Sequence, residues 1–413
     1  PSVLLQSEDA GQLEFDRHAL LDSEIEALIS EAYGLNASDT EALERDLHEA
    51  VDFQHGTSSI EENDEDDEEG SVAETAQERF DSFLSYALGC ALGRWDVRYA
   101  TGMKNPPQQP APFDPLPRLP LGALKEENYD PENYPIEIAP HGFLCSDEGN
   151  PWDLIEKIRG VFDVTLEERS NEIEQQALVT LSVTDLREYF RNSNRFFTQH
   201  LRRYTKSRRY SPIYWPLSTP SGSYTLWLYY HRLTDQTLYT CVNDFVDPKL
   251  KEVSDDATSL RSKSNRSSAE EKELERLSDL ELELKDFRDE LLRIARFWKP
   301  NLNDGVQITA APLWNLFQHR QWKARLKDTW EKLEAGDYDW AHLALSVWPD
   351  RVVRASHKDR SYAIAHDLDD QLWHEVEVEK VGRGGRVTKT IEWQPRNLSS
   401  ADLQRIITEV KAR

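Results

Sequence analysis

"SSAEEKELERLSDLELELKDFRDELLRIARFW", residues 267–298, is the stretch that decides the fold of this 413-residue chain. Its apolar residues return at strictly alternating spacings of three and four, the a/d pattern of a helix with one continuous apolar seam. The seam consists of Leu277, Leu280, Leu284, Phe287, Leu291, Ile294 and Trp298. We expect one long amphipathic helix that packs on another helix of the same chain as an antiparallel hairpin. The alternative is that the seam joins two copies of the chain.

One β-hairpin is expected before this helix in the sequence and another after it. "SPIYWPLST", residues 211–219, and "SYTLWLYYHRL", residues 223–233, have strand composition and flank the turn signal Pro220-Ser221-Gly222. "EVEVEKVGRGGRVTKTIEW", residues 375–393, alternates on both sides of a glycine turn. Arg383 and Arg386 in that turn resemble RGG-type nucleic-acid contacts, although solvating arginines in a glycine turn are the simpler interpretation.

Most of the remaining chain has helical patterns. Helices are predicted within residues 22–51, 73–97, 151–162 and 183–209. In the second of these, Phe80, Phe83, Leu84, Ala87 and Leu88 form one apolar stripe. The fold class is therefore predicted to be α+β and predominantly helical.

The chain divides into four predicted regions. A helical region, residues 1–104, contains the acidic segment "EENDEDDEEG" at 61–70, which we interpret as a solvated loop or a mimic of nucleic-acid phosphate. A proline-rich connector at 105–150 should run extended over a surface. A central basic and aromatic region with the long helix follows at 151–300, and a Trp-rich region that ends in a β-hairpin occupies 301–413.

Composition limits the class of protein. The net charge of −27 argues against a protein coated in nucleic-acid-binding charge, although it does not exclude a local basic face. Cys90, Cys145 and Cys241 lie far apart, as expected for buried thiols in a reducing compartment. No apolar run is long enough to span a bilayer, so we expect a cytoplasmic protein with no membrane partner.

The sequence predicts no catalytic, cofactor-binding or metal-binding residues. It has neither a GxGxxG nor a P-loop motif. "NPPQ" at 105–108 is similar to the NPPY motif of amino-methyltransferases, but Gln replaces the aromatic residue and further prolines follow, so we interpret it as a linker. The C-terminal His/Asp set could serve a metal nuclease, but its apolar, helix-like surroundings favour core or helix-end roles. This set comprises His342, His357, His366, His374, Asp339, Asp350 and Asp359.

One basic stretch stands out against the acidic background. From Tyr189 to Thr234 there is no Asp or Glu, and there are eight Lys or Arg. Phosphates are the natural counter-charge for so many cations, and Tyr or Trp can stack on bases; the alternative is an internal ion-pair surface with the chain's own acids. The predicted DNA-binding residues are Arg202, Arg203, Lys206, Arg208 and Arg209, with Ser221 and Tyr224 near the turn as weaker candidates.

"HLRRYTKSRRYSPIYWPLSTPSGSYTLWLYYHRLTDQTLY", residues 200–239, resembles the C-terminal part of large adenine-specific DNA methyltransferases of bacterial phage-defence loci. These are the PglX type of BREX systems and the related DISARM enzyme. Further stretches resemble the family in the same order and extend over nearly the whole chain. They are "EIEALISEAYGL", "LSYALGCALGRWDV", "DPKL", "NDGVQITAAPLWNLF", "GDYDWAHLALSVWPDRV" and "DRSYAIAHDLDDQLW".

The resemblance implies that this chain supplies only a part of the family's function. Enzymes of this family transfer a methyl group from S-adenosylmethionine to adenine, and their cofactor and catalytic motifs precede the matched region. We therefore expect a C-terminal DNA-recognition and assembly portion whose partners are double-stranded DNA, a catalytic methyltransferase half in the same or a separate chain, and other defence-complex subunits. The alternative is a non-catalytic docking module that does not contact DNA.

Overall fold

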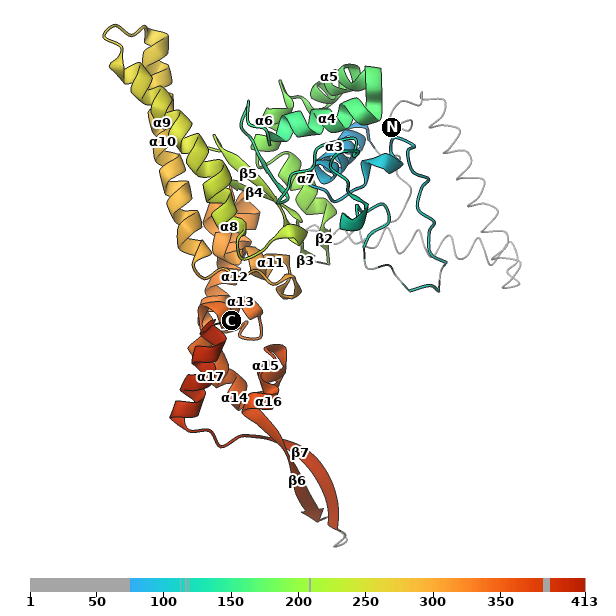
Figure 1. Ribbon diagram of the computed structural model, residues 1–413, viewed down its shortest axis with the longest axis vertical. Helices are drawn as coiled ribbons and strands as arrows, with labels where there is room; N and C mark the ends of the chain where they lie inside the picture. The colour runs from blue at the N-terminus through green and yellow to red at the C-terminus, as the bar shows by residue number, and fades with distance from the viewer. Residues whose placement is uncertain are drawn as a thin grey trace, which may run out of the picture. The chain divides into compact units, whose positions relative to one another are not determined.

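The computed structural model describes residues 75–111, 113–115, 117, 119–207, 209–381 and 387–412. Nearly all of the described residues belong to one compact unit that begins at Phe80. The described chain is mainly helical with small antiparallel sheets, which confirms the predicted α+β class (Figure 1). The predicted N-terminal helices, the acidic segment 61–70, Arg208 and the glycine turn with its two arginines lie outside the described residues.

A three-stranded antiparallel sheet lies at the centre of this unit. Its strands are β1 (Phe143–Cys145), β4 (Tyr214–Ser218) and β5 (Thr225–Tyr229), in the order β1-β5-β4. The predicted hairpin is thus confirmed as β4–β5, while β1 was not anticipated within the proline-rich region. Every residue of the three strands is buried.

Aromatic packing shows why both faces of the sheet are apolar. Trp227 on one face contacts the rings of Phe190 and Phe196, with centroids 5.7 and 5.5 Å away. Those rings belong to α6 (Leu186–Arg191) and α7 (Phe196–Arg203). On the opposite face, Trp215 contacts Phe317 at 6.2 Å. A strand buried on both faces shows continuous apolar sequence, as these do.

The segment predicted as one helix over 183–209 is broken, so that prediction was partly wrong. Helices α6 and α7 are separated at 192–195, where Asn192 accepts a side-chain hydrogen bond from the backbone N–H of Asn194 (3.0 Å) and competes with helical bonding. After Arg203 the chain forms a small hairpin of β2 (Thr205–Lys206) and β3 (Arg209–Tyr210). Ser207 lies in its turn with a left-handed φ of 47°.

The helices around the sheet follow the predicted apolar patterns. In α3 (Ala76–Ala91) the whole stripe is buried, and Phe83 stacks on Phe162 of α4 (Leu154–Leu166) at 4.9 Å. Helix α5 (Ser170–Leu181) follows α4 after a short 3₁₀ turn, η4 (Glu167–Arg169).

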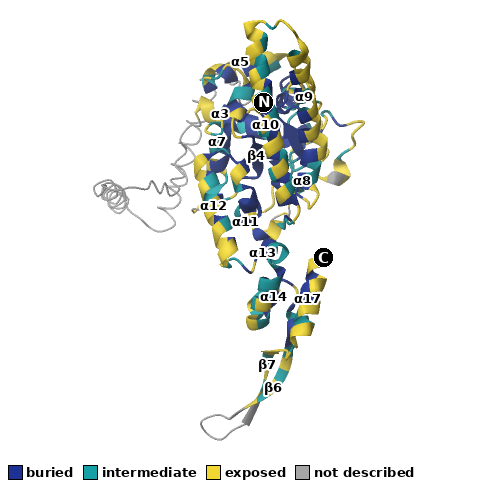
Figure 2. Cartoon of the chain, turned by 90° about the vertical axis from the view of Figure 1, so that its left-hand side faces the viewer, coloured by how far each residue is buried: buried dark blue, intermediate teal, exposed yellow. Residues whose placement is uncertain are grey.

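The long amphipathic helix is confirmed as α10 (Ser268–Ala295), which begins at a capping box formed by Ser267 and Glu270. It packs against α9 (Asp247–Ser262), and the two helices run side by side in Figures 1 and 2. All seven seam residues are buried within this single chain. The seam is therefore occupied by the chain's own helices, as predicted for the antiparallel hairpin.

Helix α9 continues directly from two shorter segments. These are α8 (Thr237–Thr240) and a π-helical turn, η6 (Cys241–Val246), which contacts both α9 and α10. Phe245 of the π-helical turn contacts Phe143 of β1 at 6.3 Å, so the turn covers the same face of the sheet as Phe317.

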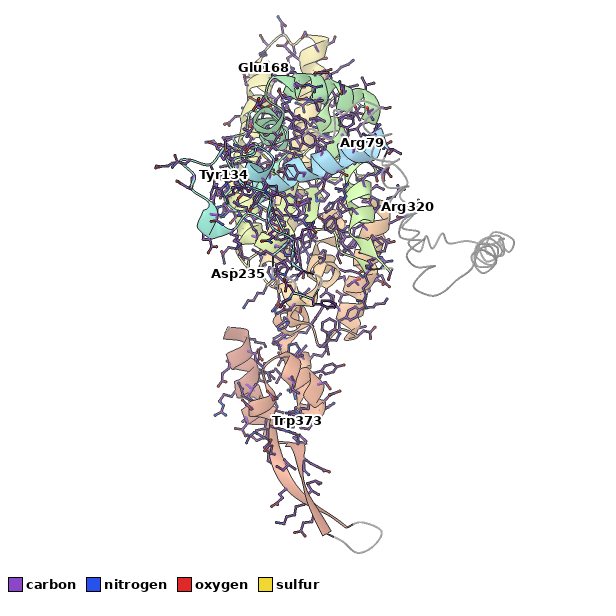
Figure 3. All side chains as sticks on the ribbon, turned by 90° about the vertical axis from the view of Figure 1, so that its right-hand side faces the viewer. Arg79, Tyr134, Glu168, Asp235, Arg320 and Trp373 are labelled. Carbon is purple, nitrogen blue, oxygen red and sulfur yellow. The ribbon has the colours of Figure 1, made fainter. Side chains whose placement is uncertain are left out.

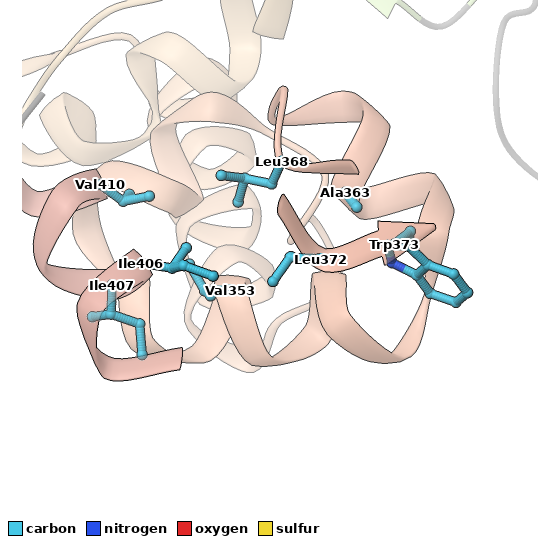
Figure 4. Packing of buried hydrophobic residues seen from close by; sticks show 8 residues of the cluster. All are labelled: Val353, Ala363, Leu368, Leu372, Trp373, Ile406, Ile407 and Val410. Carbon is cyan, nitrogen blue, oxygen red and sulfur yellow. The ribbon is translucent and has the colours of Figure 1, made fainter. Parts of the chain in front are cut away.

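The C-terminal part packs around a second apolar cluster (Figure 4). Its members are Val353, Ala363, Leu368, Leu372, Trp373, Ile406, Ile407 and Val410. Helices α14 (Pro349–Lys358), α15 (Arg360–Ala365), α16 (Asp369–Leu372) and α17 (Ser400–Ala412) contribute to this cluster. Between α10 and α14 the chain forms α11 (Val306–Ala310), α12 (Arg320–Ala335) and α13 (His342–Val347). The predicted second hairpin is confirmed as β6 (Trp373–Val381) paired with β7 (Val387–Pro395).

Cys90, Cys145 and Cys241 are free and buried, and burial raises the pKa of each thiol above its ordinary value. Among the described residues, no helix has the length and apolar character needed to cross a membrane.

Candidate nucleic-acid interface

The predicted basic residues lie at the end of α7 and in the hairpin that follows it. Arg202 and Arg203 occupy the last turn of α7, Lys206 lies in β2 and Arg209 in β3; all four are exposed. Cations at a helix C-terminus are favoured by its dipole, which explains the two arginines of α7 in part. It does not explain the two cations of the hairpin.

Lys206 and Arg209 are direct partners across the β2–β3 ladder. Like charges in directly opposed positions destabilise a strand pair. Among the described residues no carboxylate forms an ion pair with either of them, or with Arg202 or Arg203. The internal ion-pair alternative therefore finds no support at these four residues, and the hairpin bears an uncompensated repulsion.

His200 fixes the base of this basic hairpin. Its ring lies fully buried at the end of α7, and Nε2 accepts hydrogen bonds from the backbone N–H groups of Ile213 and Tyr214 (3.1 and 3.0 Å). Burial, and then the nearby cations Arg94 and Arg203, hold the pKa of His200 well below its usual value. The neutral ring thus ties α7 to the start of β4, so the cations project from a rigid support.

A second group of cations lies in the first half of α12. Residues 305–327 contain no Asp or Glu, and α12 begins with Arg320, Lys323, Arg325 and Lys327 (Figure 3 labels the first). Cations in the first turns of a helix oppose its dipole, whereas anions are favoured there. An anion near this end would be favoured by the dipole and by the side chains, although the backbone N–H of Trp322 already donates to Nδ1 of His319 (3.3 Å).

The two groups of cations meet through Tyr210. The Arg325 guanidinium lies 4.1 Å from the centre of the Tyr210 ring, and the Trp322 ring lies 6.5 Å from it. A groove of about 730 Å³ opens at this junction. Its lining residues are Leu201, Tyr210, Gln307, Gln321, Trp322, Ala324, Arg325, Asp328, Lys332 and Tyr338.

We call the eight cations of α7, the β2–β3 hairpin and the first half of α12 the basic surface. They are Arg202, Arg203, Lys206, Arg209, Arg320, Lys323, Arg325 and Lys327. Several already have partners: Lys327 approaches Glu331 at 3.9 Å, Arg203 donates a hydrogen bond to the Ser82 hydroxyl (2.8 Å), and Arg325 lies over the Tyr210 ring. Burial lowers the pKa of Lys323, whose ammonium lies 5.8 Å from the centre of the Trp314 ring. The α12 cations were missed from the sequence, although the acid-free run 305–327 was a signal for them.

The two weaker sequence candidates do not join the basic surface. Ser221 is exposed but donates a hydrogen bond to Glu283 of α10 (2.6 Å), so it lies beside an acid. Tyr224 is 1 % exposed, and burial raises the pKa of its enclosed hydroxyl far above the usual value. Tyr214 and Trp215 are also core residues, whereas Tyr210 is half-buried at the groove.

The C-terminal histidines make structural hydrogen bonds. Asp304 accepts from the backbone N–H of His342 and lies 2.9 Å from its ring Nδ1, while His366, at the end of α15, lies 2.7 Å from the carbonyl oxygen of Asp339. Within the described part of the chain, no three His, Cys, Asp or Glu side chains are grouped as metal ligands. These contacts are those of core and helix-end residues and give no support to the nuclease hypothesis.

No protein-family model matches this chain, and no curated protein matches it at a significant level.

Proposed function

We propose that the chain is the C-terminal DNA-recognition and assembly portion of an S-adenosylmethionine-dependent, adenine-specific DNA methyltransferase in a bacterial anti-phage defence system, acting in the cytoplasm. The observation that supports DNA contact is the opposed pair Lys206 and Arg209, which lowers hairpin stability and has no carboxylate partner among the described residues. Phosphate oxygens would supply the missing counter-charge. The methyl-transfer part of the proposal rests on the family resemblance.

In this proposal the basic surface positions a DNA duplex through its phosphates. Phosphate contacts set register and orientation, and sequence is read by additional contacts to base edges. The groove beside Tyr210 contains amide and aromatic side chains, including Gln321, that are suited to such contacts. The cofactor and the methyl transfer would belong to the catalytic half.

The assembly role is supported by the acidic outer face of the α9–α10 pair. Exposed acids follow the outward side of α10, where they repel DNA and favour basic partner surfaces. They include Glu271, Glu275, Asp279, Asp286 and Asp289. A duplex would thus be restricted to the basic surface, while subunits of the complex bind elsewhere.

The test is fluorescence anisotropy of a labelled mixed-sequence duplex across a salt series. The first variant reverses Arg202, Lys206 and Arg209 to Glu, and the control reverses the exposed Lys251 and Lys358. The logarithm of the binding constant should fall by about 0.9 per logarithm of salt for each phosphate contact, so the variant should lose about 2.7 of the slope and the control almost nothing.

A second variant tests the α12 half alone. Arg320→Glu with Lys327→Glu should remove about 1.8 of the slope if both cations contact phosphates. If the wild-type chain does not bind DNA at 20 mM salt, or if all variants bind like the wild type, the DNA-recognition proposal fails. The docking module that does not contact DNA then becomes the better description.

A further inference from the structure

A pocket of about 630 Å³ lies away from the basic surface, between the segment that leads into β1 and the segment that joins β5 to α8. Its lining residues are Leu124, Tyr129, Ile138, Ala139, Pro140, His141, Phe143, His231, Arg232, Leu233, Thr234, Gln236, Thr237 and Thr240. No acid is among them, although 76 of the 413 residues of the chain are Asp or Glu. The lining therefore combines one arginine, two histidines, three threonines and a glutamine with apolar walls.

Two glycines leave the space that the Arg232 side chain occupies in this pocket. A side chain on Gly93 would come within 2.9 Å of its Nη2, and one on Gly142 within 2.9 Å of its Cδ. Both glycines have left-handed φ angles, 75° and 71°, which other residues rarely adopt. The backbone thus leaves room for the guanidinium at Gly93 and for the aliphatic part of the same side chain at Gly142.

This guanidinium has weak partners in the described chain. Nη1 donates a long hydrogen bond of 3.4 Å to the carbonyl of Ala139, and no described carboxylate forms an ion pair with Arg232. A half-buried arginine normally finds a carboxylate or phosphate, because its planar set of donors matches their oxygens. The pocket therefore presents an unused donor set for an anion.

The other side of the pocket is provided by the start of the helix that becomes α9. Thr237 and Thr240 of α8 line it, and Thr237 Oγ1 accepts a hydrogen bond from the Thr234 backbone N–H (2.8 Å). The π-helical turn Cys241–Val246 follows immediately. Such turns are rare and are found frequently at functional sites, although none of the six residues of this one lines the pocket itself.

We infer that this pocket binds the phosphate group of a small phosphorylated ligand of about nucleotide size. Arg232 and the threonine hydroxyls hold the phosphate, while His141 and His231 lie exposed at the rim. Leu124, Phe143 and the other apolar residues contact the rest of the ligand. The volume lies within the range of about 300–1,000 Å³ typical of small-molecule sites. This inference is independent of the DNA-recognition proposal.

Isothermal titration calorimetry of the full chain in phosphate-free buffer tests the inference. The probes are pyrophosphate, AMP and adenosine. The test variant, Gln236→Glu, adds a carboxylate to the acid-free lining at an exposed residue with almost no change of side-chain shape. The control variant, Gln404→Glu on α17, makes the same charge change outside the pocket. We expect pyrophosphate and AMP to bind the wild type and the control alike, and Gln236→Glu to weaken both at least tenfold. Adenosine should bind at least tenfold more weakly than AMP.

Arg232→Gln is the second variant, and it should abolish AMP binding while circular dichroism shows that the chain remains folded. If this variant unfolds, Gln236→Glu alone decides. The inference is overturned if neither phosphate probe binds at 5 mM, if Gln236→Glu binds them like the wild type, or if adenosine binds as tightly as AMP. DNA anisotropy of Gln236→Glu should equal that of the wild type, which separates this pocket from the basic surface.

Discussion

Replacing Lys206 by Glu should stabilise the chain and weaken DNA binding at the same time. In the folded protein Lys206 lies directly opposite Arg209, so the substitution turns a like-charge pair into an ion pair. Opposed charge pairs in a sheet contribute roughly 0.2–1 kcal/mol, and like charges cost a similar amount, so the free energy of unfolding should rise by about 0.4–2 kcal/mol.

The effect on DNA binding has the opposite sign. Loss of one phosphate contact removes about 0.9 from the salt slope. The affinity of the variant relative to the wild type should therefore be roughly eightfold lower at 0.1 M salt than at 1 M salt. Repulsion between the new carboxylate of Lys206→Glu and the phosphates adds to this loss. Lys358→Glu, an exposed residue at the end of α14, changes the net charge equally and should leave DNA affinity nearly constant.

The assays are urea unfolding followed by tryptophan fluorescence and DNA anisotropy at several salt concentrations, on the same preparations. A fall of more than about 0.5 kcal/mol in the free energy of unfolding of Lys206→Glu would contradict the repulsion, because Lys206 would then have a structural partner. A variant that is more stable but binds DNA with the wild-type salt slope would contradict the phosphate contact.

Three further outcomes are expected. Because burial lowers the pKa of His200, protonation favours the unfolded chain, so the free energy of unfolding should fall by up to ~1.4 kcal/mol per pH unit below about pH 6.5; urea titrations should show a smaller dependence for His200→Gln. Asp153→Asn leaves the bidentate guanidinium of Arg187 (2.7 and 2.8 Å) without its buried carboxylate and should cost about 3–5 kcal/mol, of which Arg187→Met in the same chain restores part; an unchanged midpoint in urea contradicts this. Phe287→Ala in the buried seam should cost about 3–5 kcal/mol, against less than about 0.5 for Leu282→Ala on the exposed face of the same helix, and equal losses would mean that the seam is not packed.

Elements with a long periodic pattern were predictable from the sequence. The seam of α10 repeats over seven positions, and the β4–β5 hairpin joins two apolar segments through a turn signal. In both cases many residues report the same local geometry, so an error at one of them does not change the prediction. The acid-free stretch 189–234 likewise located the first half of the basic surface.

Features that depend on contacts between distant segments were not predictable. Strand β1 has three residues and exists because Leu144 pairs with Trp227, 83 positions along the chain. Strands β2 and β3 have two residues each, which is too short for any alternation to appear. The sequence around the turn Pro220-Ser221-Gly222 could not show that Tyr224 is buried. The sheet is covered on both faces, so the strands do not alternate between buried and exposed residues.

Both halves of the basic surface, and the pocket around Arg232, are assembled by the fold. Tyr210 meets Arg325 across more than a hundred residues, and Gly93 lies against Arg232 across a similar separation. Nothing in the local sequence at either end indicates the other. The acid-free runs indicated that each segment is basic, but only the tertiary structure shows which segments are neighbours.

The opposed Lys206 and Arg209 also make the stiffness of the hairpin depend on its surroundings. Their repulsion loosens β2 and β3 in the free chain, and an anion that lies between them removes it. By linkage, an anion that binds the paired hairpin more tightly than the separated strands must stabilise that pairing to the same extent. Amide protons of the hairpin should therefore exchange more quickly in the free chain than beside a bound anion, because the anion would tighten the pairing that the free chain already forms.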